Sequence, residues 1–204
     1  MTTIKLYGPR MGSGLRTHWV SAELGTPYES VGIDFSKGDN RSEWFLKVNP
    51  MGQVPALVEG EFKLAESLAI CSYLIEKAGS DLGGKTPQER AAAWQWSLWA
   101  MFNPGPQLSK LASPAWTKQP LAADVEAAAK TAADKYLAIF ETHLATNQFV
   151  AGSNFTVGDI NVASSLGYAA YSNFDMSPYP KVKTWLATIM ARPSYAKAAT
   201  EPKS

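Results

Sequence analysis

The stretch "NPMGQVPALVEGEFKLAES", residues 49–67, holds the pattern that decides the fold. Pro55 stands directly before a short apolar run, although proline lacks the backbone N–H that an inner strand needs. A Glu-Gly turn at residues 59–60 and a second short run follow, which is the pattern of a β-hairpin. Residues 66–79 then carry the apolar stripe of a helix that ends at a glycine. The stretch therefore predicts a hairpin that leads directly into a helix.

The residues on the N-terminal side of this stretch extend the pattern to a small α/β domain. The sequence predicts a strand, a helix and a second strand there, and then a helical turn or short helix. These elements fall at residues 3–7, 14–25, 28–33 and 41–47. We place the α/β domain at residues 1–79, and the composition of residues 80–86 is that of a linker.

The residues on the C-terminal side are expected to be entirely helical. Pro87 opens a long amphipathic helix, and the "NPGP" at residues 103–106 must kink or break it. Further helical patterns lie at residues 121–146, 155–170 and 180–193. The predicted fold class is therefore an α/β N-terminal domain followed by an all-α domain over residues 87–204.

Composition and charge exclude several classes of function. The 204 residues are 46% hydrophobic and 18% charged, with a net charge of +1, so nothing points to nucleic acid or to an acidic membrane surface. No apolar run approaches the ~20 residues of a membrane span, and the N-terminus lacks signal-peptide features, which predicts a cytoplasmic protein. The single cysteine, Cys71, lies on an apolar helix stripe and is predicted to be core. His18 and His143 fall in separate helices, so metal binding is not expected.

Residues 54–67 have the features of a receptor for a small peptide. A cis proline at position 55 would leave the backbone N–H and C=O of Val54 outside the sheet, where an extended peptide could pair with them. At the start of the helix, Ser67 and free N–H groups could hold a carboxylate, and Glu66 could hold an ammonium group. The alternative is that Pro55 is only a turn and that Glu66-Ser67 only caps the helix.

"VNPMGQVPAL…LAES" resembles the glutathione-binding half of the cytosolic glutathione transferases, which join a thioredoxin-like domain to an all-helical one. "IKLYG" and "RTHWVSAELGTPYE" resemble their first strand, first helix and second strand. "FVAGSNFTVGDINVAS" resembles their buried helix start, with Thr156 as N-cap and Asp159 as its capping-box partner. The resemblance covers essentially the whole chain.

The resemblance implies glutathione as co-substrate and a set of residues that bind it. Val54 would pair with the cysteinyl backbone, Pro55 would be cis, and Glu66 and Ser67 would hold the γ-glutamyl head. At the glycine end the resemblance places Gln53 and Arg41, whose guanidinium suits a carboxylate. For Arg41 the alternative is a solvated surface charge.

The residue that stabilises the glutathione thiolate stays open between three candidates. Ser13 precedes the first predicted helix, where its hydroxyl could donate to the sulfur or could cap the helix. Tyr7 matches the catalytic tyrosine of other classes in the family. The third candidate is the set of backbone amides from Met11 to Gly14. The loop holds no cysteine, which argues against the thiol-exchange members of the family.

The second substrate is expected to meet the long helix that begins at Pro87. By resemblance, this helix lines the electrophile site, and aromatic residues there favour an apolar electrophile. Core packing or a subunit interface is the alternative for each side chain taken alone. The candidate pocket residues are Met11, Trp96, Trp99, Phe102 and Asn103, with Trp116 as a further possibility.

The sequence thus predicts a glutathione transferase that conjugates the glutathione thiolate to an apolar electrophile. A homodimer is expected from the resemblance, without nucleic-acid or membrane partners and without a metal. One alternative is a glutathione-dependent isomerase, dehalogenase or peroxidase that uses the same site. Another is a non-catalytic module that keeps the fold for dimerisation or protein binding.

Overall fold

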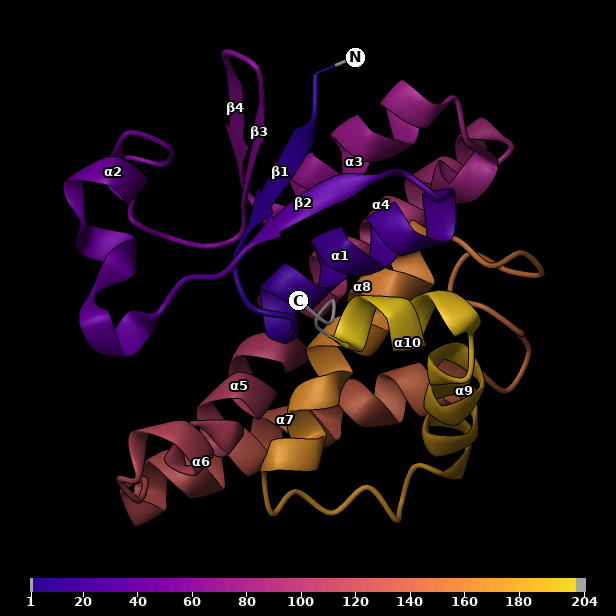
Figure 1. Cartoon of the computed structure of the whole chain (residues 1–204). Coiled ribbons are helices and arrows are strands. Elements are labelled where there is room, and N and C mark those ends of the chain that lie inside the picture. Colours follow the sequence, from indigo (N-terminus) through magenta and orange to yellow (C-terminus); the bar gives the residue numbers. More distant parts are fainter. Residues whose placement is uncertain (1, 201–204) are drawn as a thin grey trace. The chain divides into compact units, whose positions relative to one another are not determined.

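A mixed β-sheet forms the centre of the first of two structural units in this computed structural model, which describes residues 2–200. Within those residues the sheet has four strands in the order β2-β1-β3-β4 (Figure 1). β1 and β2 are parallel, and the β1–β3 and β3–β4 pairs are antiparallel. The strands are β1 (Ile4–Tyr7), β2 (Tyr28–Val31), β3 (Ala56–Glu59) and β4 (Phe62–Ala65). The parallel pair needs a crossover connection, and α1 (Gly12–Leu24) supplies it.

Helices cover both faces of this sheet. α1 packs against α3 (Ser67–Ala78) on one face, and both helices also contact the strands. On the other face lies α2 (Glu43–Leu46), whose Phe45 is fully buried against Tyr7 and Ala56. Two short 3₁₀ helices, η1 (Phe35–Lys37) and η2 (Asp39–Arg41), lead into α2. Figure 1 shows α2 on the side of the sheet opposite α1 and α3.

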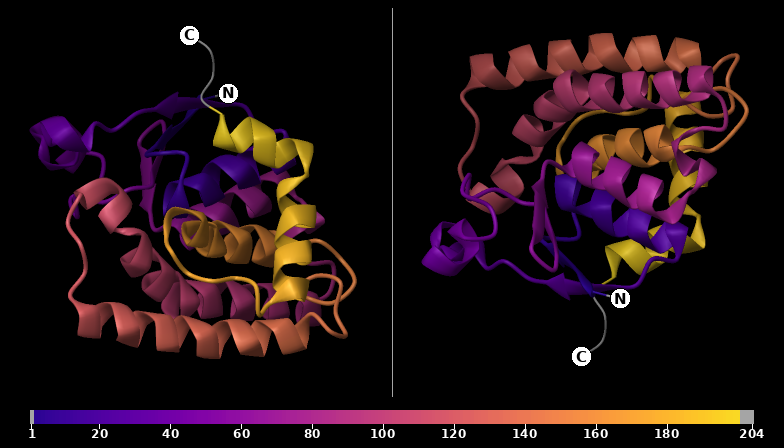
Figure 2. Two further views of the ribbon diagram at one scale, coloured as in Figure 1. Left: turned by 90° about the horizontal axis from the view of Figure 1, so that it is seen from below. Right: turned by 90° about the horizontal axis from the view of Figure 1, so that it is seen from above.

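The C-terminal helix belongs to the first unit. This unit combines residues 1–80 with the segment that starts at residue 193, and α10 (Pro193–Ala199) packs along α1. Both views of Figure 2 show α10 beside α1. The Trp19 indole donates to the Ser194 hydroxyl at 3.1 Å, and that hydroxyl donates to Glu23. The segment from residue 193 thus groups with the first unit, whereas the sequence analysis placed it in the all-α domain at residues 87–204.

The second unit, residues 81–192, is helical throughout. After α4 the chain turns at Asn103, which has helix-breaking dihedrals of φ −114° and ψ −87°, and Pro104 starts the next helix. The helical elements are η3 (Asp81–Gly83), α4 (Pro87–Phe102), α5 (Pro104–Ala112), α6 (Pro114–Thr117), α7 (Ala123–His143), α8 (Val157–Leu166), η4 (Gly167–Tyr171) and α9 (Pro180–Met190). The break predicted at "NPGP" is confirmed. The expected linker, residues 80–86, belongs mostly to this second unit, which starts at residue 81 and begins with η3.

α8 is the buried centre of the second unit. All ten of its residues are buried, and it packs against α4, α5 and α9. The Asp159 carboxylate accepts hydrogen bonds from the Thr156 N–H at 2.8 Å and the Val150 N–H at 2.9 Å. This is the capping box expected at the start of the helix. Burial nevertheless raises the pKa of Asp159 to about 6, because desolvation outweighs the hydrogen bonds to the carboxylate.

Candidate functional site

Ser13 lies in the first turn of α1, at the end of the loop that follows β1. The N-cap of α1 is Met11, which has extended backbone dihedrals and no side-chain capping bond, so Ser13 is not the N-cap. Its hydroxyl is half-buried and lies 3.5 Å from the carbonyl oxygen of Val54. That distance is long for an O–H···O hydrogen bond, so the hydroxyl remains available to another acceptor. Ser13 and Val54 therefore face one small region of the first unit.

Val54 lies just before β3 and precedes a cis peptide bond to Pro55, as the sequence predicts. Among residues 2–200, no group accepts a hydrogen bond from the Val54 N–H. Asn49, which is buried, fixes the preceding turn: its side chain donates to the Gln53 carbonyl at 2.7 Å and accepts from the Met51 N–H at 3.1 Å. The backbone at Val54 is thus held rigidly with polar groups that an extended peptide can use.

Glu66 and Ser67 occupy the junction between β4 and α3. The Glu66 backbone has φ 68° and ψ 115°. Residues other than glycine seldom adopt such a conformation, and the exceptions cluster at binding sites. Its side chain is exposed and makes no capping bond to the helix. The alternative that Glu66 serves only as a helix cap is therefore disfavoured. Ser67 is the first residue of α3 and is buried.

Arg16 is a buried cation that the sequence analysis missed. It lies on α1, one turn after Ser13, and its Nη1 donates to the Ser67 hydroxyl oxygen at 3.0 Å. Because the guanidinium occupies a lone pair of that oxygen, the hydroxyl hydrogen is directed to another acceptor. The N–H groups at the start of α3 add positive potential at the same point. This end of α3 is suited to bind a carboxylate. The available signal was a charged residue beside Leu15 in the predicted helix at residues 14–25.

Arg41 and Gln53 lie together on the turn that precedes Val54. The Arg41 Nη1 donates to the Met51 carbonyl at 3.4 Å. Its guanidinium lies over Gly52, where a Cβ atom would be 2.8 Å from Nη1. Both Arg41 and Gln53 are exposed. The Arg41 charge thus lies on the surface at one end of the Val54 segment.

Tyr7 is packed as a core residue. Its side chain is 9% exposed, and its ring lies 6.1 Å from the ring of Phe45 and 6.4 Å from that of Trp44. It therefore faces α2, whereas Ser13 faces Val54. This packing favours Ser13 over Tyr7 as a donor to a ligand near Val54. Cys71 is also core, as predicted, and burial raises the pKa of its thiol to about 12.

The candidate pocket residues of the second unit fall into two groups. Trp96 is buried, with its ring 5.3 Å from that of Phe140 and 4.3 Å from that of His143. Trp99 packs on Phe140 as well, at 5.5 Å. These contacts favour the core alternative for both tryptophans. The other candidates, Phe102, Asn103 and Trp116, lie where α4 passes into α5 and in α6, and Phe102 and Trp116 are exposed.

Trp116 has two aromatic neighbours that the sequence analysis missed. The Tyr168 ring lies 6.2 Å from the Trp116 ring, and the Tyr171 ring lies 6.4 Å from it. Trp116 is 44% exposed and Tyr171 is 54% exposed. Exposed rings at this spacing form an apolar surface of the kind that binds flat or apolar molecules. Their separation of more than 50 residues in sequence hides the cluster from pattern analysis.

One hollow of the first unit lies away from the predicted binding residues. It has a volume of about 950 Å³ and is lined by the start of β1, the ends of α1 and α3, and the start of β2. None of the residues from Ser13 to Ser67 that were predicted to bind a ligand contributes to its lining. Within residues 2–200 no group of three or more His, Cys, Asp or Glu residues is placed to hold a metal. No helix in that range is long and apolar enough to span a membrane.

Comparison with known proteins identifies the family. Residues 2–76 match the model of the glutathione S-transferase N-terminal domain, and residues 106–193 match that of its C-terminal domain. Glutathione S-transferase 3 of Zea mays is 36% identical over 211 residues, which cover 97% of this chain and 93% of that protein. The chain belongs to the glutathione S-transferase family. The sheet and the helical unit are thus the two domains of a glutathione transferase.

Solved structures agree with this membership. Poplar glutathione transferase F1 matches with a TM-score of 0.90 and 26% identity, over 97% of each chain. Glutathione S-transferase-I, solved with lactoylglutathione bound, matches with a TM-score of 0.85 and 28% identity, over 97% of this chain and 98% of that one. The fold class expected from the sequence, an α/β unit and a helical unit of the glutathione transferase type, is confirmed.

Proposed function

We propose that this glutathione transferase adds the thiolate sulfur of glutathione to an apolar electrophile. The observation that carries the proposal is the position of the Ser13 hydroxyl, 3.5 Å from the Val54 carbonyl oxygen. A peptide whose cysteine pairs with the Val54 backbone would bring its sulfur beside Ser13. A hydroxyl that donates to this sulfur stabilises the thiolate, which is the nucleophilic form.

The remaining groups of the first unit bind the two ends of glutathione. The Ser67 hydroxyl and the N–H groups at the start of α3 receive the γ-glutamyl carboxylate, and Glu66 receives the ammonium group. Arg16 supports this end by its hydrogen bond to Ser67. Arg41 and Gln53 receive the glycine end. Tyr7 and the amides from Met11 to Gly14 remain alternatives for the thiolate.

The reaction itself requires no group beyond these and the electrophile. The glutathione thiol loses its proton to solvent, and the thiolate attacks the electrophilic carbon. With an aryl chloride, a sulfur–carbon bond forms, and the carbon–chlorine bond breaks with its electron pair on chloride. The protein contributes thiolate stabilisation and proximity, which together lower the barrier.

The electrophile is expected to meet apolar side chains. The exposed rings around Trp116, together with Phe102, Asn103 and Met11, are the candidates for this contact. Trp96 and Trp99 are weaker candidates, because their rings pack on α7. We further propose a cytoplasmic homodimer without a metal, nucleic-acid or membrane partner, on family membership and composition.

Steady-state turnover of glutathione with an activated aryl chloride tests the proposal. Chloride release should be catalysed by the wild type, and Ser13→Ala should lower kcat about a hundredfold, the usual effect of removing one donor to a developing anion. The dissociation constant of S-methylglutathione should change little, because that ligand has no ionisable thiol. Binding of glutathione without turnover of any electrophile would favour the non-catalytic alternative. Turnover unaffected by Ser13→Ala would move the catalytic assignment elsewhere in the loop.

A further inference from the structure

The loop between β1 and α1 is fastened to the C-terminal helix by one side chain, Arg10. Its Nη1 donates to the carbonyl oxygen of Ala198 at 2.8 Å and approaches that of Lys197 at 3.4 Å. Both carbonyls belong to the last turn of α10, where the helix dipole places partial negative charge. The guanidinium therefore holds the end of α10 by charge as well as by hydrogen bonding.

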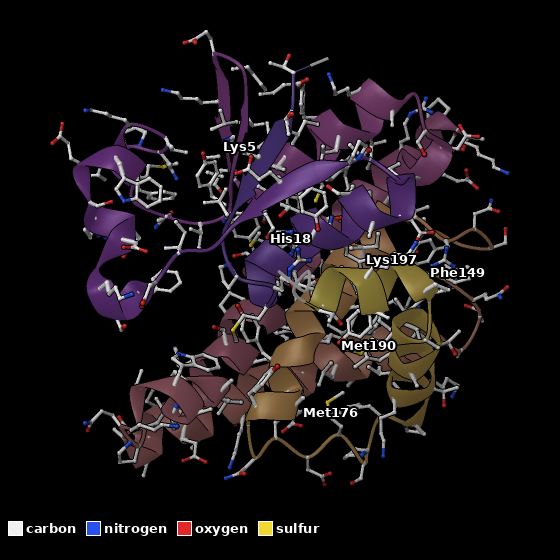
Figure 3. The ribbon with its side chains drawn as sticks, in the orientation of Figure 1. Lys5, His18, Phe149, Met176, Met190 and Lys197 are labelled. Atoms are coloured by element: carbon white, nitrogen blue, oxygen red, sulfur yellow. The ribbon has the colours of Figure 1, made fainter. Side chains whose placement is uncertain are left out.

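The same guanidinium is also linked to α1, through hydrogen bonds that join Arg10 to Tyr28 and Tyr28 to His18. Nη1 donates to the Tyr28 hydroxyl oxygen at 3.2 Å, and that hydroxyl lies 3.1 Å from Nδ1 of His18. The other ring nitrogen of His18, Nε2, lies 3.4 Å from the carbonyl oxygen of Gly8. Figure 3 labels His18 on α1 and Lys197 on α10, the two helices that these contacts connect.

Each hydrogen bond in the network that links Arg10, Tyr28, His18 and Gly8 has one possible direction. The Gly8 carbonyl can only accept, so Nε2 of His18 carries the hydrogen. In the neutral ring Nδ1 is then an acceptor, so the Tyr28 hydroxyl donates to it and is left to accept from Arg10. Burial and the nearby Arg10 charge lower the pKa of His18 to about 4, which keeps the ring neutral at physiological pH.

This hydrogen-bond network holds the short loop between β1 and α1 at two points. His18 holds Gly8 at the exit of β1, and Arg10 holds the centre of the loop. Ser13 follows three residues after Arg10 and has no side-chain hydrogen bond in residues 2–200 besides its long contact with Val54. The placement of the Ser13 hydroxyl therefore depends on how firmly the loop is held.

We propose that Arg10 is a positioning residue for the thiolate site, acting through its bonds to α10 and, by way of Tyr28 and His18, to Gly8. This inference rests on the proposed function, because it assumes that Ser13 serves the glutathione sulfur. α10 then has a role in catalysis as well as in packing. Displacement of a catalytic group by about 1 Å can cost a hundredfold in rate.

The test is the pKa of the bound glutathione thiol, read from ultraviolet thiolate absorbance against pH. In Arg10→Ala this pKa should rise toward that of a free thiol, ~8.5, and kcat should fall about tenfold or more. The dissociation constant of S-methylglutathione should stay within about twofold, since Glu66 and Ser67 are untouched. Lys197→Ala is the matched control: it removes a side chain of α10 but keeps the carbonyl, and should leave the thiol pKa unchanged.

Tyr28→Phe provides a second, milder variant. It keeps the Arg10 contact with Ala198 and removes only the hydroxyl that connects to His18, so the thiol pKa should rise by less than in Arg10→Ala. An unchanged thiol pKa in folded Arg10→Ala overturns the inference even if its melting temperature falls, because a purely structural role predicts that result. If Arg10→Ala does not fold, an unchanged thiol pKa in Tyr28→Phe overturns it. A wild type that does not lower the thiol pKa contradicts the proposed function instead.

Discussion

Glu66 combines a strained backbone with a side chain that the fold itself does not use. A positive φ at a residue with a Cβ costs of order 1–3 kcal/mol and persists where the surroundings demand it. The Glu66 carboxylate makes no capping bond to the N–H groups at the start of α3. We therefore propose that ligand binding, rather than stability, accounts for Glu66 at this position.

Glu66→Gln should therefore weaken glutathione binding without unfolding the protein. Loss of the exposed charge should raise KM for glutathione about threefold to tenfold, with kcat little changed. The analogue of glutathione that lacks the γ-glutamyl amino group gives the control, because it should bind the wild type and the variant equally well. Equal loss of affinity for both ligands would exclude an ammonium contact with Glu66.

His18 should make the first unit sensitive to acid. In the unfolded chain the His18 pKa is the ordinary 6.5, and in the folded chain it is about 4, so the unfolded state binds the proton more readily. This contribution to stability is complete above pH 6.5 and is lost as the pH falls toward 4, by up to about 3 kcal/mol. Asp159 acts in the opposite sense in an overlapping window, because its pKa is raised.

Denaturant unfolding at pH 7 and pH 4.5 separates the two residues. The loss of stability between these pH values should be smaller in His18→Gln than in the wild type, while Asp159 contributes equally in both. An identical pH dependence in the two proteins would show that His18 is not held neutral by the fold.

Among the structural elements, α1 begins with a constraint that only glycine can meet. A Cβ on Gly14 would collide with the carbonyl oxygen of Pro9, because the loop folds back over the first turn of the helix. Gly167, in contrast, has open space around its Cβ position and lies in helical backbone at φ −55° and ψ −23°. The two glycines form a matched pair.

Gly14→Ala should destabilise the protein, by about 1–3 kcal/mol, although alanine favours helices. Gly167→Ala should be neutral or stabilising by up to about 1 kcal/mol. Chemical denaturation of both variants provides the comparison. A stabilising Gly14→Ala would mean that the loop does not fold back on α1.

The elements that were predictable are those with their own local signal. Proline at N1 marks α4, the Glu-Gly turn marks the hairpin, and Thr156 with Asp159 marks α8. α10 was missed because its seven residues carry no apolar period and gain their place from contacts with α1. α5 was missed because it starts with Pro-Gly-Pro, a sequence that is typical of the end of a helix and not of its beginning.

The candidate site was predictable only in part, for the same reason. Some site residues lie close together in the sequence, so the motif itself identifies them. These are Val54, Pro55, Glu66 and Ser67. Arg16 meets Ser67 across 51 residues of sequence, and only the folded chain reveals that contact.

For the whole molecule, we propose that the two units bind different substrates. In the proposed function, the first unit supplies the glutathione contacts and the second supplies apolar rings for the electrophile. Trp116→Ala should therefore raise KM for an apolar electrophile about tenfold, because one aromatic contact with the substrate is lost, and leave KM for glutathione unchanged. Ile139→Ala, which removes an exposed apolar side chain of α7, is the control and should change neither constant. If Trp116→Ala raised only the KM for glutathione, the assignment of Trp116 to the electrophile would be wrong.

The most direct test of the central claim is the thiol pKa of glutathione bound to the wild type, Ser13→Ala and Tyr7→Phe. We expect a pKa well below ~8.5 in the wild type and in Tyr7→Phe, and a return toward the free value in Ser13→Ala. A lowered pKa that survives Ser13→Ala and disappears in Tyr7→Phe would contradict the account, because the thiolate would then depend on the residue packed against α2.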